Sequence, residues 1–130
     1  MLPYQPVPIA PPVGTLWQGP SEVDVMPNGH LIVFQRSAIN MLLEYDQDGK
    51  LLRTFDDNIA ARAHGVKIDR HGNIWVTDIV CNTVMKLAPT GAVLMTLGTK
   101  GQAGTWDEAA GQQNTAAGRK PRCEVCIRHC

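Results

Sequence analysis

The sequence lacks three features, each of which would indicate a particular kind of partner. Its 130 residues include 12 basic and 12 acidic side chains, so there is no excess of positive charge to neutralise phosphates. No apolar run reaches the ~20 residues that a membrane helix needs. The first residues, broken by Pro3, Pro6 and Pro8, show neither the basic stretch nor the unbroken apolar stretch of a secretion signal. We therefore expect no nucleic-acid partner, no membrane-spanning helix and no export signal.

What the chain does contain is apolar residues in sufficient number for a core. Hydrophobic residues make up 44% of the sequence and charged residues 18%, which is typical of a soluble globular protein. A length of 130 residues allows one small domain at most.

An internal repeat is the most informative pattern in the sequence. Residues 22–55 and 65–97 are two copies of one motif, in which short alternating apolar runs are separated by turn dipeptides ending in glycine. The aligned residues lie 43 positions apart early in the motif and 42 apart later: Val23 with Val66, Gly29 with Gly72, Val33 with Val76, and Gly49 with Gly91.

Each copy predicts four short antiparallel strands. The expected ranges are 22–26, 30–34, 41–45 and 51–55 in the first copy, and 65–69, 73–77, 84–87 and 93–97 in the second. Glycine in the turns supplies the positive φ that tight hairpins need. Four-stranded sheets repeated every forty or so residues are typical of propeller blades. The predicted fold is all-β, a partial β-propeller of two blades with flexible N- and C-terminal segments.

The segments outside the repeat have a different composition. Residues 1–21 hold six prolines and are expected to be extended, without regular strand pairing. Residues 22–99 contain the two blades, and residues 100–130 are predicted to form a disordered, cysteine-containing tail.

A longer run in the second copy resembles a known family. Residues 63–78, AHGVKIDRHGNIWVTD, followed by VMKL at 84–87, are similar to the NHL-repeat propellers. Within that family the chain most resembles the lyase that cleaves peptidyl-α-hydroxyglycine into a peptide amide and glyoxylate, together with its bacterial relatives. Residues 33–36 and 97–101 also resemble that group. The resemblance covers roughly residues 20–108, about two blades of a fold that has six in the family.

The resemblance implies a set of site residues and a peptide-like substrate. His64 matches a zinc-binding histidine of the family, and Arg36 matches an arginine that stabilises the substrate's carboxylate or developing negative charge. Val23 and Val66 match positions whose backbone carbonyls help to hold calcium. Gln35 departs from the family, which often has histidine there.

The resemblance also implies a site that is incomplete. A catalytic zinc usually takes three protein ligands, and the family draws three histidines from three blades. This sequence matches one of them, and Tyr4 and Tyr45 do not fall where the family has its general base. We therefore expect the isolated chain to lack catalysis and hold metal poorly. His64 could equally be a turn histidine, and Arg36 a solvated charge at a strand end.

The end of the chain carries a separate pattern of metal-binding residue types. Cys123, Cys126, His129 and Cys130 crowd into eight residues, whereas structural zinc sites usually pair two ligand clusters across a longer loop. A metal or redox clip is thus one interpretation, and a flexible tail with reduced thiols is the favoured one. The sequence after about Ala110 departs from the relatives, which favours the hypothesis of a truncated or frame-altered product.

Two blades alone would share one interface and leave two outer faces. We expect those faces to expose apolar side chains and to drive self-association; the residues concerned are Val33, Leu43, Ile74, Val76 and Leu94. Three functions remain open from the sequence: a fragment related to the amidating lyase, a non-catalytic NHL-type binding module, and a non-functional truncated product.

Overall fold

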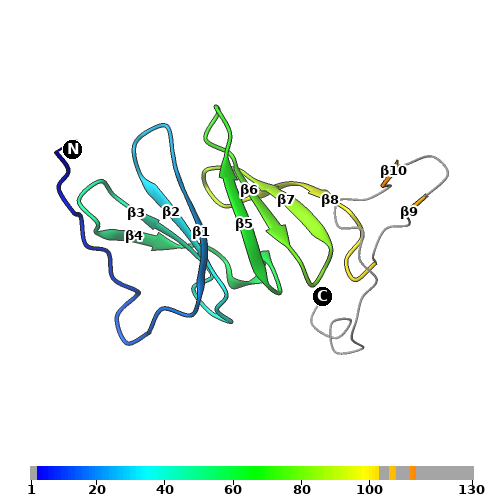
Figure 1. The fold of residues 1–130 in the computed structure, drawn as a ribbon, viewed down its shortest axis with the longest axis horizontal. Coiled ribbons are helices and arrows are strands. Elements are labelled where there is room, and N and C mark those ends of the chain that lie inside the picture. The colour runs from blue at the N-terminus through cyan, green and yellow to red at the C-terminus, as the bar shows by residue number, and fades with distance from the viewer. Residues whose placement is uncertain (1–2, 103–105, 108–111, 114–130) are drawn as a thin grey trace.

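Two four-stranded antiparallel sheets make up the fold (Figure 1). The structure is a computed structural model that describes residues 3–102, 106–107 and 112–113. Blade 1 consists of β1 (Pro20–Val25), β2 (Leu31–Gln35), β3 (Leu42–Tyr45) and β4 (Leu51–Thr54). Blade 2 consists of β5 (Ala63–Ile68), β6 (Ile74–Asp78), β7 (Thr83–Leu87) and β8 (Val93–Leu97). In both sheets the strands follow one another in sequence order, which confirms the predicted all-β, two-blade fold.

Short elements join and follow the blades. A 3-10 turn, η1 (Asp57–Ile59), leads from blade 1 into blade 2. After blade 2, β9 (Trp106–Asp107) pairs with β10 (Gln112–Gln113), a ladder that the sequence pattern does not predict. Across the part of the chain that the structure describes, there is no helix long and apolar enough to cross a membrane.

The hairpin turns use the glycine positions that the repeat identifies. Gly29 and Gly72 have φ of +84° and +79°, a left-handed conformation that side chains with a Cβ rarely adopt. In the second of these turns the Asp69 carboxylate accepts hydrogen bonds from the backbone N–H groups of His71 and Asn73, at 2.9 and 3.0 Å. These bonds lower the pKa of Asp69, with the Asn73 side-chain amide making the largest contribution. The repeat thus sets the strand register through its turns.

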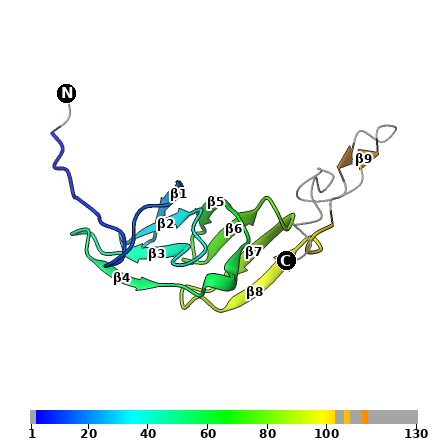
Figure 2. The same ribbon diagram turned by 90° about the horizontal axis from the view of Figure 1, so that it is seen from below.

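The two blades pack face to face over one apolar core (Figure 2). We call the side of blade 1 that contacts blade 2 its forward face, and the opposite side its back face. The faces of blade 2 are named by equivalence, so its back face contacts blade 1 and its forward face points away from blade 1. The forward face of blade 1 and the back face of blade 2 bury their side chains against each other. Blade 1 contributes Ile32, Phe34, Leu42 and Phe55, and blade 2 contributes Val66, Ile74, Val76, Met85 and Leu87.

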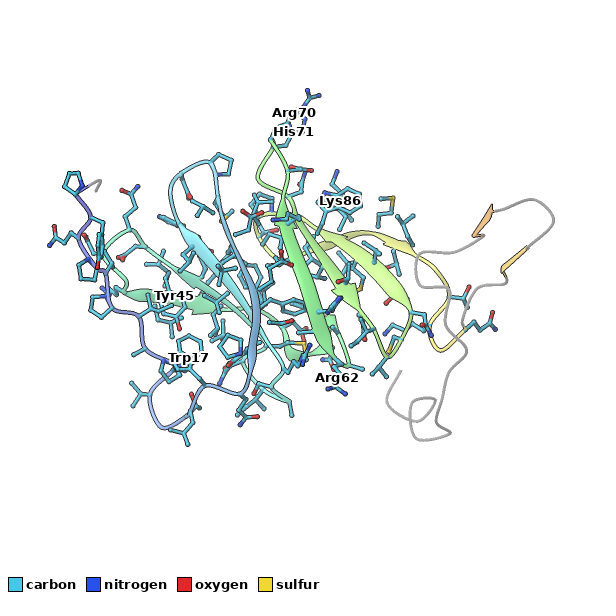
Figure 3. All side chains as sticks on the ribbon, viewed as in Figure 1. Trp17, Tyr45, Arg62, Arg70, His71 and Lys86 are labelled. Carbon is cyan, nitrogen blue, oxygen red and sulfur yellow. The ribbon has the colours of Figure 1, made fainter. Side chains whose placement is uncertain are left out.

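The outer, back face of blade 1 is buried over β2 and β3, contrary to the sequence-based expectation. Val33 and Leu43 were predicted to be exposed, but the first segment of the chain covers them, and they are 1% and 0% exposed. Ile9 and Trp17 pack over this face, and Trp17 lies beside Tyr45 with ring centroids 6.4 Å apart (Figure 3). The proline-rich segment therefore occupies the place that a preceding blade would take.

The predicted exposure of blade 2 is wrong for its back face and correct for its outer strand. Ile74 and Val76 are buried because their side chains point toward blade 1 rather than away from it. Leu94 on β8 is 55% exposed, as predicted. The direction in which each strand faces decides the difference, since alternate residues point to opposite sides of a sheet.

Candidate functional site at the blade junction

Arg36 links the loop after β2 in blade 1 to the start of β5 in blade 2. It follows β2, and its side chain is exposed. The backbone N–H of Arg36 donates to the Gly19 carbonyl at 3.1 Å, and its Nε donates to the Ala63 carbonyl at 3.3 Å. The guanidinium group is therefore fixed against β5, directly beside the residue that precedes His64.

His64 is the second residue of β5, next to an irregularity in register between Ala63 and Gly65. Its side chain is exposed, and its carbonyl accepts a hydrogen bond from the Ser21 Oγ at 2.5 Å. Ser21 lies in β1, so this bond links the innermost strands of the two blades. The structure thus brings the backbone of His64 and the side chain of Arg36 to the same end of the junction.

A depression of about 290 Å³ opens at this end, between the loop after β2 and the loop before β5. Its lining residues are Arg36, Ser37, Ala38, Ala61 and Arg62. The lining includes two arginines and no acidic residue, which favours an anionic ligand. Arg62 lies at the opposite end of the molecule from Arg70 and His71 (Figure 3).

A buried carboxylate holds one wall of the depression in place. Asp78, which is 5% exposed, accepts hydrogen bonds from the backbone N–H groups of Ala61 and Arg62 at 2.6 and 3.2 Å. It also accepts from Val80 and Cys81 at 2.9 and 3.1 Å. The loop that carries Arg62 is therefore fixed to the end of β6, which limits its freedom before any ligand binds.

Val23 and Val66 lie at equivalent positions in β1 and β5. Val23 pairs with Val33, and Val66 pairs with Val76 in the same register. The N–H of Val66 points away from β6 and donates to the Glu22 Oε2 at 2.9 Å. Because the N–H and C=O of a strand residue point to the same edge, the Val66 carbonyl also faces the inner edge of the blade.

Glu22 and Asp24 form a latch between the innermost strands that the sequence analysis did not identify. Asp24 Oδ2 accepts from the Ile68 N–H at 2.8 Å, parallel to the bond from Val66 to Glu22. Burial raises the pKa of Asp24. The hydrogen bonds from Ile68 and Val25 and the charge of Lys67 together lower it by more, so the net shift of the pKa is downward. Both carboxylates replace the strand partner that the inner edge of β5 lacks.

The residues described do not fit a catalytic zinc site. Zinc needs three protein ligands, and within residues 3–102, 106–107 and 112–113 no three His, Cys, Asp or Glu side chains gather in a metal-binding group. His30 instead lies beside Glu44, with Nδ1 and Oε1 2.7 Å apart, and His71 lies at the other end of the molecule from Arg62 (Figure 3). Cys123, Cys126, His129 and Cys130 fall outside the described residues.

The calcium positions are likewise a partial set. Calcium takes six to eight oxygen ligands. Val23 and Val66 would supply two backbone carbonyls, which is too few to hold the ion without further donors.

The remaining candidates have structural partners. Gln35 is 1% exposed, accepts from the Gln18 N–H at 3.1 Å and donates to the Asn40 carbonyl at 2.8 Å, so it anchors the first segment. Tyr45 donates to the Ala10 carbonyl at 2.6 Å. Sequence reasoning missed Arg62, although it lies two residues before His64 and directly before the same strand.

Comparison with known proteins places the fold in a class. No protein-family model matches the chain, and no curated protein matches it. Among solved structures, it is similar to one described as streptogramin B lyase, with a TM-score of 0.56 and 21% identity. The matched region covers 65% of this chain and 28% of that one, so this chain spans little more than a quarter of its neighbour. At this identity the similarity shows the fold alone: the chain is a partial β-propeller.

Proposed function

We propose that the blade junction is a carboxylate-binding site related to that of the amidating lyases, and that the chain binds a peptide-like ligand without cleaving it. The observation that carries the proposal is the pair of arginines that line one depression, Arg36 from the loop after β2 and Arg62 from the loop before β5. An arginine presents a planar fork of N–H donors that matches a carboxylate. The free C-terminal carboxylate of a peptide is therefore the chemistry that this depression suits.

Two features favour a site that is organised before the ligand arrives. Arg36 is held by the Ala63 carbonyl through Nε, which leaves its terminal nitrogens for a ligand. Arg62 sits on a loop whose backbone is fixed by the buried Asp78. The backbone at residues 61 and 62 then has less freedom to lose on binding, which favours affinity.

Cleavage of the C–N bond would need groups that the described residues do not bring together. The amidating lyase resemblance implies a zinc ion and a general base, yet among the described residues no group of three metal-ligating side chains includes His64. Lyase activity is the alternative function, favoured by the adjacency of Arg36 and the start of β5. Its missing ligands would have to come from outside the described residues.

The test is a nuclear magnetic resonance titration with two peptides that differ at one group. One peptide ends in glycine with a free carboxylate, and the other is the same peptide with a C-terminal amide. We expect the acid to shift the backbone signals of residues 36–38 and 61–64, and the amide to have little effect. Arg36→Ala should weaken binding roughly tenfold or more, since a hydrogen bond to a charged group contributes about 1.5–3 kcal/mol.

Arg70→Ala is the matched control, because Arg70 is an exposed arginine at the opposite end of the molecule (Figure 3). Equal binding of acid and amide, or equal weakening by both arginine substitutions, would contradict the proposal. Release of glyoxylate from a peptidyl-α-hydroxyglycine, with zinc bound in a 1:1 ratio, would instead establish the lyase alternative.

A further inference from the structure

The two outer faces of this chain occupy positions in the repeat that are equivalent to those of the two faces that meet inside it. Inside the chain, the forward face of blade 1 packs against the back face of blade 2. The 43-residue repeat makes the back face of blade 1 equivalent to the back face of blade 2, and the forward face of blade 2 equivalent to that of blade 1. The forward face of blade 2 could therefore meet the back face of blade 1 in a second copy, as the forward face of blade 1 meets the back face of blade 2 inside the chain.

The back face of blade 1 is apolar and is shared between the first segment and solvent. Leu43 and Tyr45 are buried beneath Ile9 and Trp17. Val23 and Val25, on the innermost strand of the same face, remain 50% and 56% exposed. The cover formed by the first segment therefore protects the β3 side of the face and leaves the β1 side open.

The forward face of blade 2 is the corresponding surface at the other side of the chain, and within residues 3–102 no blade packs against it. The pairing of β7 with β8 puts Val84 opposite Leu97 and Lys86 opposite Met95, on the side of the sheet away from the core. Met95 and Leu97 are 38% and 44% exposed, and Trp75 shares this side in β6.

The charges on this face are balanced within the chain. Lys86 Nζ lies 3.5 Å from an Asp69 oxygen and 5.0 Å from the Trp75 ring centroid, and Lys67 Nζ lies 3.6 Å from Glu22 and 3.8 Å from Asp24. The carboxylates that offset these lysines are all supplied by the same chain, so an apolar partner is not excluded by charge.

We propose that the forward face of blade 2 docks a second copy of this chain on the back face of its blade 1, in competition with that copy's first segment. The contact continues the blade stacking already present inside the chain, so its occupant is a second copy in head-to-tail orientation. Packing of two forward faces would bring the lysines of both copies together, whereas the back face offers valines, Leu43 and Tyr45. The contact is heterologous, and the assembly grows beyond a dimer or closes as a ring. It is independent of the ligand at the blade junction.

The first experiment measures mass against concentration by sedimentation of the full chain and two variants, Trp17→Ala and Trp17→Ala/Val84→Glu. Trp17→Ala removes the largest side chain of the cover, and we expect it to strengthen association at least tenfold, with species larger than a dimer. Val84→Glu places a charge on the forward face and should return the Trp17→Ala chain to a monomer. Aggregation caused by unfolding would not be reversed by a change on the opposite side of the molecule. An unchanged mass for Trp17→Ala would overturn the competition.

The second experiment separates head-to-tail docking from face-to-face docking by mixing two variants. Trp17→Ala/Val84→Glu has an open back face and a blocked forward face, and Val23→Glu has a blocked back face and an open forward face. Each should be a monomer alone, and together they should form a 1:1 complex that grows no further. A Val23→Glu chain that dimerises alone, or a mixture that forms no complex, rules out the proposed orientation. Tyr45→Phe, which loses the hydrogen bond to Ala10, is the milder variant if Trp17→Ala does not fold.

Discussion

Replacement of Glu22 by alanine tests whether the carboxylate latch holds the two blades together. Glu22 accepts the N–H of Val66 at 2.9 Å, and Val66 is 1% exposed, so its amide has little access to water once the carboxylate is gone. The same carboxylate also lies 3.6 Å from Lys67 Nζ, so two interactions would be lost at once. Their magnitudes differ enough to be separated.

The hydrogen bond should account for most of the effect. A bond to a charged acceptor contributes about 1.5–3 kcal/mol, and an unsatisfied buried donor costs a similar amount. An exposed ion pair contributes about 0–1 kcal/mol, and the Lys67 side chain is 72% exposed. Glu22 is itself 38% exposed, which lets some water replace it. We expect Glu22→Ala to lower the free energy of unfolding by about 1–2 kcal/mol.

The assay is urea-induced unfolding followed by tryptophan fluorescence, with the slope of the transition checked for constancy. Glu22→Gln keeps an acceptor oxygen and should recover most of the loss. Lys67→Ala removes only the ion pair, and Asp48→Ala removes an exposed carboxylate in the turn after β3; both should stay within about 0.5 kcal/mol of the original chain. If Lys67→Ala destabilises as much as Glu22→Ala, the ion pair rather than the amide bond holds the junction, and the reasoning is refuted.

Two further predictions concern the cover on blade 1 and the buried charge at the blade interface. Gly49→Ala should destabilise the chain more than Gly14→Ala in thermal unfolding. Both glycines have positive φ, but a Cβ at Gly49 would meet the Pro8 carbonyl, whereas a Cβ at Gly14 would enter open space. Equal effects of the two substitutions would show that this contact does not hold the first segment. Burial raises the pKa of Glu44, but hydrogen bonds from His30 and Arg53 lower it more, so the net shift is downward. The stability that this shift contributes is therefore present above pH 4.5, the ordinary pKa of glutamate, and is lost as the pH falls through the lower folded pKa. Glu44→Gln should flatten this acid dependence when unfolding is measured across a range of pH. An unchanged dependence contradicts the assignment to Glu44.

The strands could be predicted from the sequence because their signals are local. Alternation of apolar residues and glycine turns placed the sixth strand at 73–77, and the structure has β6 at Ile74–Asp78. The first strand begins at Pro20, two residues earlier than predicted, because the edge of a sheet tolerates proline. Errors at the boundaries are small since the turn glycines set the register.

The candidate site could be predicted only in part. The resemblance identified Arg36 and His64, and the structure brings the Arg36 guanidinium against the carbonyl that precedes His64. Arg62 was missed, because its relevance depends on a loop from blade 2 folding back beside a loop from blade 1. Such proximity between residues 26 positions apart is set by blade packing and leaves no periodic trace in the sequence.

By itself, the sequence determined that this protein is built from two copies of a four-stranded sheet, because side-chain alternation and turn chemistry act over a few neighbouring residues. Only the tertiary structure decided which faces are covered. The proline-rich segment carries no strand pattern, yet Ile9 and Trp17 bury the back face of blade 1, where the sequence predicted exposure. Coverage depends on which surfaces meet in space, and the alternating pattern that makes a face apolar is the same whether a blade, a chain end or a second molecule lies against it.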